Sequence, residues 1–273
     1  MTFGQISAPV AAFVFVYVAA VVVLLIQGFW TTDSFTGKVV HTWNLDNYRA
    51  IADAPYPRII FRTIGMAAAV TVTCMVLAFP YAYFMVRVAG PRLRVVLLVA
   101  TVLPLWVSYL VRVYSWRLIL NPDGALNWAL NLVGLPDLNI AYTNWAMWIV
   151  FTYIWFPFMV LPVYAALERI PQSYLEASAD LGGRRPTTLR RVILPLAVPG
   201  LAAGSIFTFS LTLGDYIAPS LVGNTQFIGN VIYRNVLGLT NNIPFAAAYA
   251  MVPLAVMALY LVAARRAGAF ESL

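Results

Sequence analysis

The sequence from Glu176 to Pro195 is EASADLGGRRPTTLRRVILP, and the rest of the chain is organised around it. This stretch carries both acidic and basic residues and lies between long apolar runs. It also contains a helix stop, Gly182-Gly183, followed by a helix start at Pro186. We therefore predict two short helices joined by a turn, in a polar loop that connects two membrane-spanning segments.

The first of these helices presents a narrow apolar stripe. Pro171 suits its first position, and Gly182-Gly183 suits its C-terminal cap. The stripe contains two small residues at the spacing i, i+3, i+4, i+7, and it consists of Tyr174, Ala177, Ser178 and Leu181. Another side carries Gln172, Glu176 and Asp180. Such a helix could enter a groove on a partner protein, where its acidic residues would meet basic ones.

The second helix begins at Pro186 and continues through Arg191 into an apolar run that starts at Val192. Pro195 and Pro199 lie near the start of that run. A push on the first helix would therefore reach the base of the following span. The alternative is an ordinary basic loop of a membrane protein, with no coupling role.

Composition places the whole chain in the membrane. Of the 273 residues, 62% are hydrophobic and 10% are charged, whereas soluble domains carry about 25% charged residues. A soluble fold could not cover its surface with so little charge. The net charge of +7 reflects membrane topology, so we do not expect nucleic acid as a partner.

Six segments approach the length of about 20 apolar residues that a spanning helix needs. We predict an all-α polytopic membrane protein of one domain, with the polar loop at 168–191 and spans at about 9–29, 63–86, 95–111, 141–167, 192–213 and 244–264. Pro157 and Pro162 are expected to kink the fourth span. The first segment could be a cleaved signal peptide, but its apolar run is too long and no basic residue precedes it, which favours a retained helix.

Basic residues set the expected orientation. With the N-terminus inside, ten of the 17 lysines and arginines fall in cytoplasmic loops. The bias predicts that both termini and the 168–191 loop are cytoplasmic. The loops on the outside, 30–62, 112–140 and 214–243, are long enough to receive another molecule, and an amphipathic run from Leu126 to Val133 could lie on the membrane surface.

The chain lacks the motifs of an enzyme. His41 is the only histidine and Cys74 the only cysteine, which leaves no metal cluster and no Ser-His-Asp set. Cys74 lies within an apolar run, where we expect it to pack. Gly37-Lys38 lacks a glycine five residues earlier, so there is no phosphate-binding loop. Any ATP hydrolysis must come from another chain.

A candidate solute path runs along the fifth predicted span. Ser205, Thr208, Thr212 and Asp215 recur at helical spacing on one face, and polar groups in a span usually face a bundle interior or a cavity. Helix packing is the alternative for the hydroxyls. Asp215 lies beside aromatic residues and suits an ammonium group, although it could instead be a solvated acid or a partner of Arg234. Weaker candidates are Tyr216, Phe209, Trp106, Tyr109, Tyr114 and Trp155.

The central stretch resembles a known family. The spacing Glu176-Ala-Ser-xxx-Gly182, then nine residues, then Val192-x-Leu194-Pro195 is similar to the signature loop of the inner-membrane permeases of binding-protein-dependent ABC importers, which has Glu-Ala-Ala-xxx-Gly-(nine)-Ile-x-Leu-Pro. The chain departs from it at Ser178 and Val192, and both exchanges preserve the spacing. The segments 45–48, 108–114 and 121–127 look most like the first permease of spermidine/putrescine importers.

The resemblance implies a fold, a set of partners and a function. The fold would be the six-helix, type I permease fold, with the helix from Gln172 to Leu181 as the coupling helix. The partners would be a sister permease, two ATPase subunits that bind ATP and Mg²⁺, and an external solute-binding protein, all acting at a bacterial inner membrane. The substrate would be a polyamine; Fe(III), an anion or a sugar are alternatives. More remote alternatives are a gradient-driven carrier, a membrane enzyme or a sensor.

Overall fold

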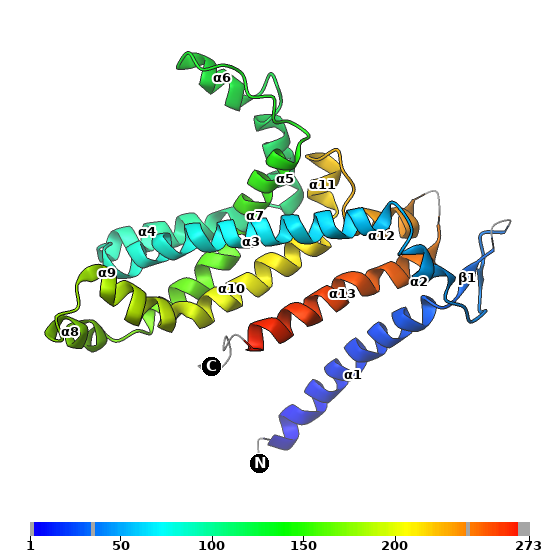
Figure 1. Cartoon of the computed structure of the whole chain (residues 1–273), viewed down its shortest axis with the longest axis horizontal. Helices are drawn as coiled ribbons and strands as arrows, with labels where there is room; N and C mark the ends of the chain where they lie inside the picture. The colour runs from blue at the N-terminus through cyan, green and yellow to red at the C-terminus, as the bar shows by residue number, and fades with distance from the viewer. Residues whose placement is uncertain (1–2, 34–35, 239–240, 267–273) are drawn as a thin grey trace.

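A computed structural model describes residues 3–33, 36–238 and 241–266, and nearly all of these residues lie in helices or short turns (Figure 1). Five helices in this part of the chain are long and apolar enough to cross a membrane: α1 (Phe3–Gln27), α3 (Tyr56–Arg87), α7 (Asn144–Glu168), the continuous run Arg185–Gly214, and α13 (Ile243–Arg266). They coincide with five of the six predicted spans. α3 begins seven residues before the predicted span, because Pro57 at its start suits the first turn of a helix.

The third predicted span, 95–111, is not a straight helix. The chain forms α4 (Pro91–Val102) and a 3₁₀ turn (Leu103–Trp106), and then α5 (Tyr109–Ile119) departs at 98°. Pro104 lies in the turn and cannot donate the backbone hydrogen bond that would continue α4, and Val107 is extended. The described residues therefore provide six spans only if this bent pair counts as one, and α5 occupies part of the predicted outside loop.

The core is built around α7. This helix packs between α3 and α10 (Leu194–Gly214), and it buries the large side chains of Phe151, Ile154 and Met159. Cys74 is buried in the same cluster, with its Sγ 3.6 Å from the carbonyl oxygen of Thr152. α1 lies apart from this core in Figure 1, and none of its residues from Val10 to Gln27 is buried.

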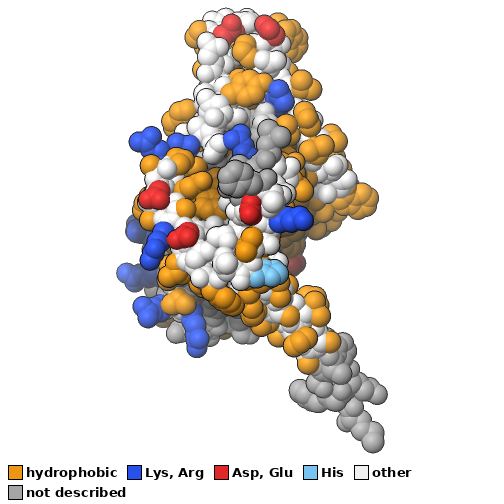
Figure 2. All heavy atoms as spheres, turned by 90° about the vertical axis from the view of Figure 1, so that its right-hand side faces the viewer, with side chains coloured by type: hydrophobic (Ala, Val, Ile, Leu, Met, Phe, Trp, Pro, Cys, Tyr) orange, Lys and Arg blue, Asp and Glu red, His pale blue; other side chains and the backbone are white. Residues whose placement is uncertain are grey.

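The two ends of the bundle differ in character. At one end, which we call the loop end, lie the α3–α4 turn, the 168–191 loop, the start of α1 and the end of α13 (Figure 1). The segments that the sequence predicts to be cytoplasmic thus lie at one end of the bundle. The opposite end, the far end, presents basic and acidic side chains interspersed with apolar ones (Figure 2).

The predicted outside loops at the far end contain structure of their own. The first holds a two-stranded antiparallel pair, β1 (Thr31–Thr32) with β2 (Val39–Val40), and the short helix α2 (Asp46–Ala50). The amphipathic run forms α6 (Ala125–Leu132), which projects from the bundle (Figure 1). The Gly- and Asn-rich segment forms α11 (Ile217–Leu221) and α12 (Ile228–Leu237), and α12 packs on α13.

Candidate functional site

The predicted coupling helix forms as α8 (Gln172–Asp180), and Gly182-Gly183 ends it as expected. Gly182 has φ +76°, a conformation that glycine adopts without strain. Its amide donates to the carbonyl of Ala179 at 2.9 Å, and the amide of Gly183 donates to that of Ser178 at 2.7 Å. These two bonds are the Schellman arrangement, which satisfies carbonyl groups at a helix end. Pro171 is the N-cap of the helix, which begins at Gln172, whereas the prediction placed Pro171 at the first helical position.

The apolar stripe of α8 lines an open groove of about 430 Å³. All four predicted residues, Tyr174, Ala177, Ser178 and Leu181, lie in its wall. The opposite wall comes from Gly183 and from the helix that follows, α9 (Arg185–Thr188) with its continuation. Leu181 is 89% exposed and Tyr174 is 51% exposed. α8 thus presents large apolar side chains to the outside of the chain, while Glu176 and Asp180 are exposed on another side.

The turn after α8 connects directly to the fifth span. The hydroxyls of Ser178 and Thr188 are 2.8 Å apart, so α8 is tied to α9. α9 continues through a π-helical turn (Leu189–Ile193) into α10. Within this turn the amide of Leu194 donates to the carbonyl of Leu189, because Pro195 has no amide proton and its ring displaces the carbonyl four residues earlier. α9, the π-helical turn and α10 thus form one continuous helical rod that begins beside the end of α8.

The two glycines differ in the space that their surroundings leave for a side chain, and this difference can be tested. A Cβ on Gly182 meets nothing within 4 Å, whereas one on Gly183 would lie 2.5 Å from both the carbonyl oxygen and the Oγ of Ser178. If α8 is the coupling helix that the resemblance implies, we expect Gly183→Ala to break the α8 cap and to lower ATP-driven uptake about tenfold. Gly182→Ala should change uptake about twofold, because it adds only left-handed strain. Uptake normalised to the amount of inserted protein is the measurement. Equal effects of the two variants would contradict this assignment.

The far end of α10 borders a pocket of about 340 Å³. Its wall contains four predicted path residues, Tyr109, Trp155, Asp215 and Tyr216, together with Ser210, Leu211 and Gly214. The rings of Tyr109 and Trp155 are stacked, with centroids 5.7 Å apart, and Tyr216 stacks on Tyr233 at 4.6 Å. The volume lies at the lower end of the range for small-molecule sites.

Asp215 is 9% exposed and is held from two sides. Its Oδ2 accepts a hydrogen bond from the hydroxyl of Tyr109, and its Oδ1 accepts from the amides of Ile217 at 2.8 Å and Ala218 at 3.2 Å. Burial raises the pKa of the Asp215 carboxyl above its ordinary value, and these three hydrogen bonds act in the opposite direction. A carboxylate can accept about four hydrogen bonds, so one position is left for a ligand.

The remaining path candidates lie elsewhere. Ser205, Thr208 and Thr212 are buried and donate to carbonyls of their own helix. Ser205 also accepts from the Tyr260 hydroxyl at 2.7 Å, and Phe209 stacks on the same tyrosine. These contacts favour the helix-packing interpretation in this conformation. Trp106, 89% exposed, and Tyr114, 43% exposed, do not line the Asp215 pocket.

Two residues that position the pocket were not predicted from the sequence. Gly229 packs so closely that a Cβ there would lie 2.6 Å from the carbonyl oxygen of Asp215. Asn230 is buried and donates to the carbonyl of Tyr216 at 3.0 Å and to the hydroxyl of Ser220 at 2.6 Å. The sequence signal for these two positions was the residue type, a glycine that permits close packing and an asparagine that can donate and accept hydrogen bonds. Both residue types are also common in loops, so the signal was not specific.

A third residue beside the pocket is Arg112, whose guanidinium lies 5.8 Å from the centroid of the Tyr109 ring. Its Nε and Nη1 are buried and have no hydrogen-bond partner among the described residues, and the same holds for Nε1 of Trp155. The pocket wall therefore contains one carboxylate and one residue with an unpartnered donor, Trp155, while Arg112 contacts the ring of Tyr109 and is not itself part of the wall.

The sequence profile of one protein family, the binding-protein-dependent transport system inner membrane component, matches residues 75–271. The chain belongs to this family. Within it, the chain is 46% identical to the inner membrane ABC transporter permease protein YdcU of Escherichia coli (strain K12), over 97% of this chain and 89% of that protein. It is 34% identical to the spermidine/putrescine transport system permease protein PotB of the same organism, over 86% of each chain.

Solved permeases share the fold. A bacterial ABC transporter involved in the import of the acidic polysaccharide alginate has a chain that matches 96% of this permease with a TM-score of 0.74 at 18% identity, and 94% of that chain is covered. At this identity the match carries the fold alone. Together these findings confirm the predicted family and fold class. They identify the chain as a permease subunit of an importer and as a multi-pass inner-membrane protein. The family is a membrane component of a transport system and not itself an enzyme. The carrier, membrane enzyme and sensor alternatives are thereby removed.

Proposed function

We propose that this permease passes a polyamine, of the spermidine/putrescine type, from an external binding protein to the cytoplasm. The observation that supports this substrate is the far-end pocket, where a buried carboxylate, Asp215, lies among the aromatic rings of Tyr109, Trp155 and Tyr216. Ammonium groups are attracted both to carboxylates and to aromatic faces. The similarity to PotB supports the same substrate class; the name of YdcU states no substrate.

The energy would come from partner chains. In this proposal two ATPase subunits bind ATP and Mg²⁺, and each receives a coupling helix, one from this permease and one from a different sister permease. Both termini and the 168–191 loop lie in the cytoplasm. The exposed stripe of α8 supports this docking, since the large side chains of Leu181 and Tyr174 are 89% and 51% exposed in their own chain. Closure of the ATPases moves α8, and the α9–α10 rod carries the movement to the Asp215 pocket, about 30 Å away by the length of α10.

A second substrate class is favoured by a specific observation. Trp155 in the pocket wall and Arg112, which contacts the ring of Tyr109, carry unpartnered buried donors, and such donors are costly unless a ligand or water binds them. An ammonium compound that also carries a carboxylate would engage Asp215 and these donors together. A polyamine would engage Asp215 and the aromatic rings but not these donors.

Uptake into proteoliposomes decides between these substrates. The permease is purified in mild detergent with the ATPase that co-elutes and reconstituted with its binding protein. We expect radiolabelled spermidine or putrescine to stimulate ATP hydrolysis and to accumulate in the vesicles. An amino acid, an anion, ferric citrate and a sugar serve as comparisons. Stimulation by one of these compounds and not by either polyamine would overturn the polyamine proposal.

A further inference from the structure

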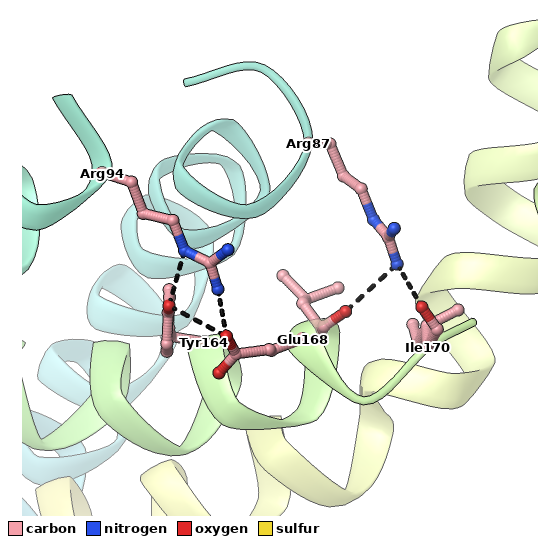
Figure 3. Close-up of polar contacts among 6 residues, drawn as sticks. Arg87, Arg94, Tyr164, Glu168 and Ile170 are labelled. Carbon is pink, nitrogen blue, oxygen red and sulfur yellow. Dashed lines mark hydrogen bonds and ion pairs between the residues drawn. The ribbon is translucent and has the colours of Figure 1, made fainter. Parts of the chain in front are cut away.

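Two arginines connect the α3–α4 turn to the joint between α7 and the coupling helix (Figure 3). Arg87 is the last residue of α3, and Arg94 lies in the first turns of α4. Both guanidinium groups reach the last turn of α7 or the residues that follow it. None of these residues belongs to the signature stretch, and the family resemblance assigns them no role.

Arg87 binds the joint on both of its sides. Its Nη2 donates to the carbonyls of Leu167 at 3.2 Å and Ile170 at 2.8 Å, and its Nη1 lies 3.5 Å from Oε1 of Gln172, the first residue of α8. The carbonyl of Leu167 is in the last turn of α7 and that of Ile170 lies two residues beyond its end, and a cation is favoured at the C-terminal end of a helix. The planar guanidinium can bind several acceptors at once, which a lysine ammonium cannot do in the same fixed geometry.

Arg94 fixes the last turn of α7 from the side of α4. Its Nε donates to the hydroxyl of Tyr164 at 2.7 Å, and its Nη2 forms an ion pair with Glu168. The guanidinium also lies 5.1 Å from the centroid of the Tyr164 ring, a cation–π contact. The ion pair is partly exposed, with 30% of the Arg94 side chain and 53% of the Glu168 side chain accessible, so by itself it contributes little. Its effect comes from acting together with Arg87.

The joint itself is short and stiff. Only residues 169–171 separate α7 from α8, and the last of them, Pro171, has its φ fixed by its ring. A linker of this kind cannot absorb a displacement of α8. The displacement is therefore transmitted to whatever holds the joint, and Arg87 and Arg94 connect the joint to α3 and α4.

We propose that Arg87 and Arg94 are positioning residues that make α3 and α4 move as one body with the coupling helix. This inference rests on the proposed function. The coupling helix is then held at both ends, by these arginines at its start and by the Ser178–Thr188 hydrogen bond at its end. Its movement drives α3 and α4 in addition to α10, so both sides of the α7 core are displaced together.

The first test measures the distance between spin labels in the assembled complex, in a Cys74→Ala background. The labels are placed on the exposed side chains of Phe84→Cys in α3 and Ser173→Cys in α8. We expect this distance to be narrow in its distribution and unchanged when ATP binds. In the double variant Arg87→Ala/Arg94→Ala the distribution broadens. A distance in the unaltered complex that changes when ATP binds, or an unchanged distribution in the double variant, would overturn the proposal.

The second test measures the amount of spermidine or putrescine taken up per ATP hydrolysed. We expect the double variant to lower this ratio about tenfold, while ATP hydrolysis and complex yield remain. Arg87→Lys keeps the charge but not the planar guanidinium, and its ratio should fall between those of the unaltered complex and the double variant. The exchange Arg94→Glu/Glu168→Arg should recover much of the uptake that Arg94→Glu loses. Arg92→Ala removes an exposed arginine of the same turn and serves as the matched control. A purely structural role would lower yield, hydrolysis and uptake together. Failure of the unaltered complex to take up either polyamine would count against the proposed function alone, since the label distance does not depend on substrate.

Discussion

ATP-driven uptake is expected to be abolished when Leu181 is replaced by aspartate. Leu181 is 89% exposed in the chain, so the change has little effect on the fold itself, as is usual for surface substitutions. In the proposed complex this side chain is buried in the ATPase groove. The variant then loses the burial of a leucine and places a carboxylate in an apolar site, which together weaken ATPase binding by about a hundredfold or more.

Co-purification of the ATPase and uptake by reconstituted vesicles are the two measurements. The matched control is Ala179→Asp, which adds the same charge to the exposed opposite side of α8, next to Glu176 and Asp180. It should leave both measurements close to normal, because a further acid on this side meets the same basic residues of the partner as Glu176 and Asp180. Glu176→Lys should also abolish uptake, because it reverses the charge that meets basic residues of the partner. If Leu181→Asp keeps its ATPase and transports normally, α8 is not the docking element.

The coupling loop was predictable from sequence because its structure is local. The spacing of the stripe in α8 and the two glycines determine a short helix with a defined cap, and each of these features depends on residues fewer than ten positions apart. The contact of Ser178 with Thr188 was not predicted. Serine in place of the alanine of the family pattern was treated as a neutral exchange, but its hydroxyl forms the bond to α9.

The path was less predictable because it depends on contacts distant in sequence. Helical periodicity placed Ser205, Thr208 and Thr212 on one face, but it could not show which neighbour that face meets. A hydroxyl within a helix can also satisfy itself on the preceding turn, as all three do. Tyr109 and Asp215 are 106 positions apart, and their pairing depends on the bend before α5. Hydropathy predicted one short span at 95–111, because it does not take into account that Pro104 lacks the backbone amide proton that a continuous helix needs.

Asp215→Asn is expected to weaken the apparent affinity for spermidine about thirtyfold, because a hydrogen bond to a charged group contributes about 2 kcal/mol. Asparagine retains an Oδ1 that accepts from the amides of Ile217 and Ala218, so the start of α11 is preserved while the charge is lost. The concentration dependence of uptake in proteoliposomes is the measurement. Asp123→Asn removes an exposed carboxylate from the loop before α6 and should have no effect.

Tyr109→Phe distinguishes the role of the Asp215 charge from the role of the hydrogen bond that Tyr109 donates to it. This variant removes the hydroxyl that donates to Oδ2 of Asp215 but keeps the ring that stacks on Trp155. If the carboxylate binds an ammonium group, an Oδ2 without its donor is more available, and the affinity should change far less than in Asp215→Asn. If Asp215 instead serves only to connect α5 to α10, Tyr109→Phe removes that contact, whereas the amide of Asp215→Asn can still donate to the Tyr109 hydroxyl. Tyr109→Phe should then impair uptake and thermal stability at least as much as Asp215→Asn. Unchanged uptake and affinity in Asp215→Asn would exclude this carboxylate from the solute path.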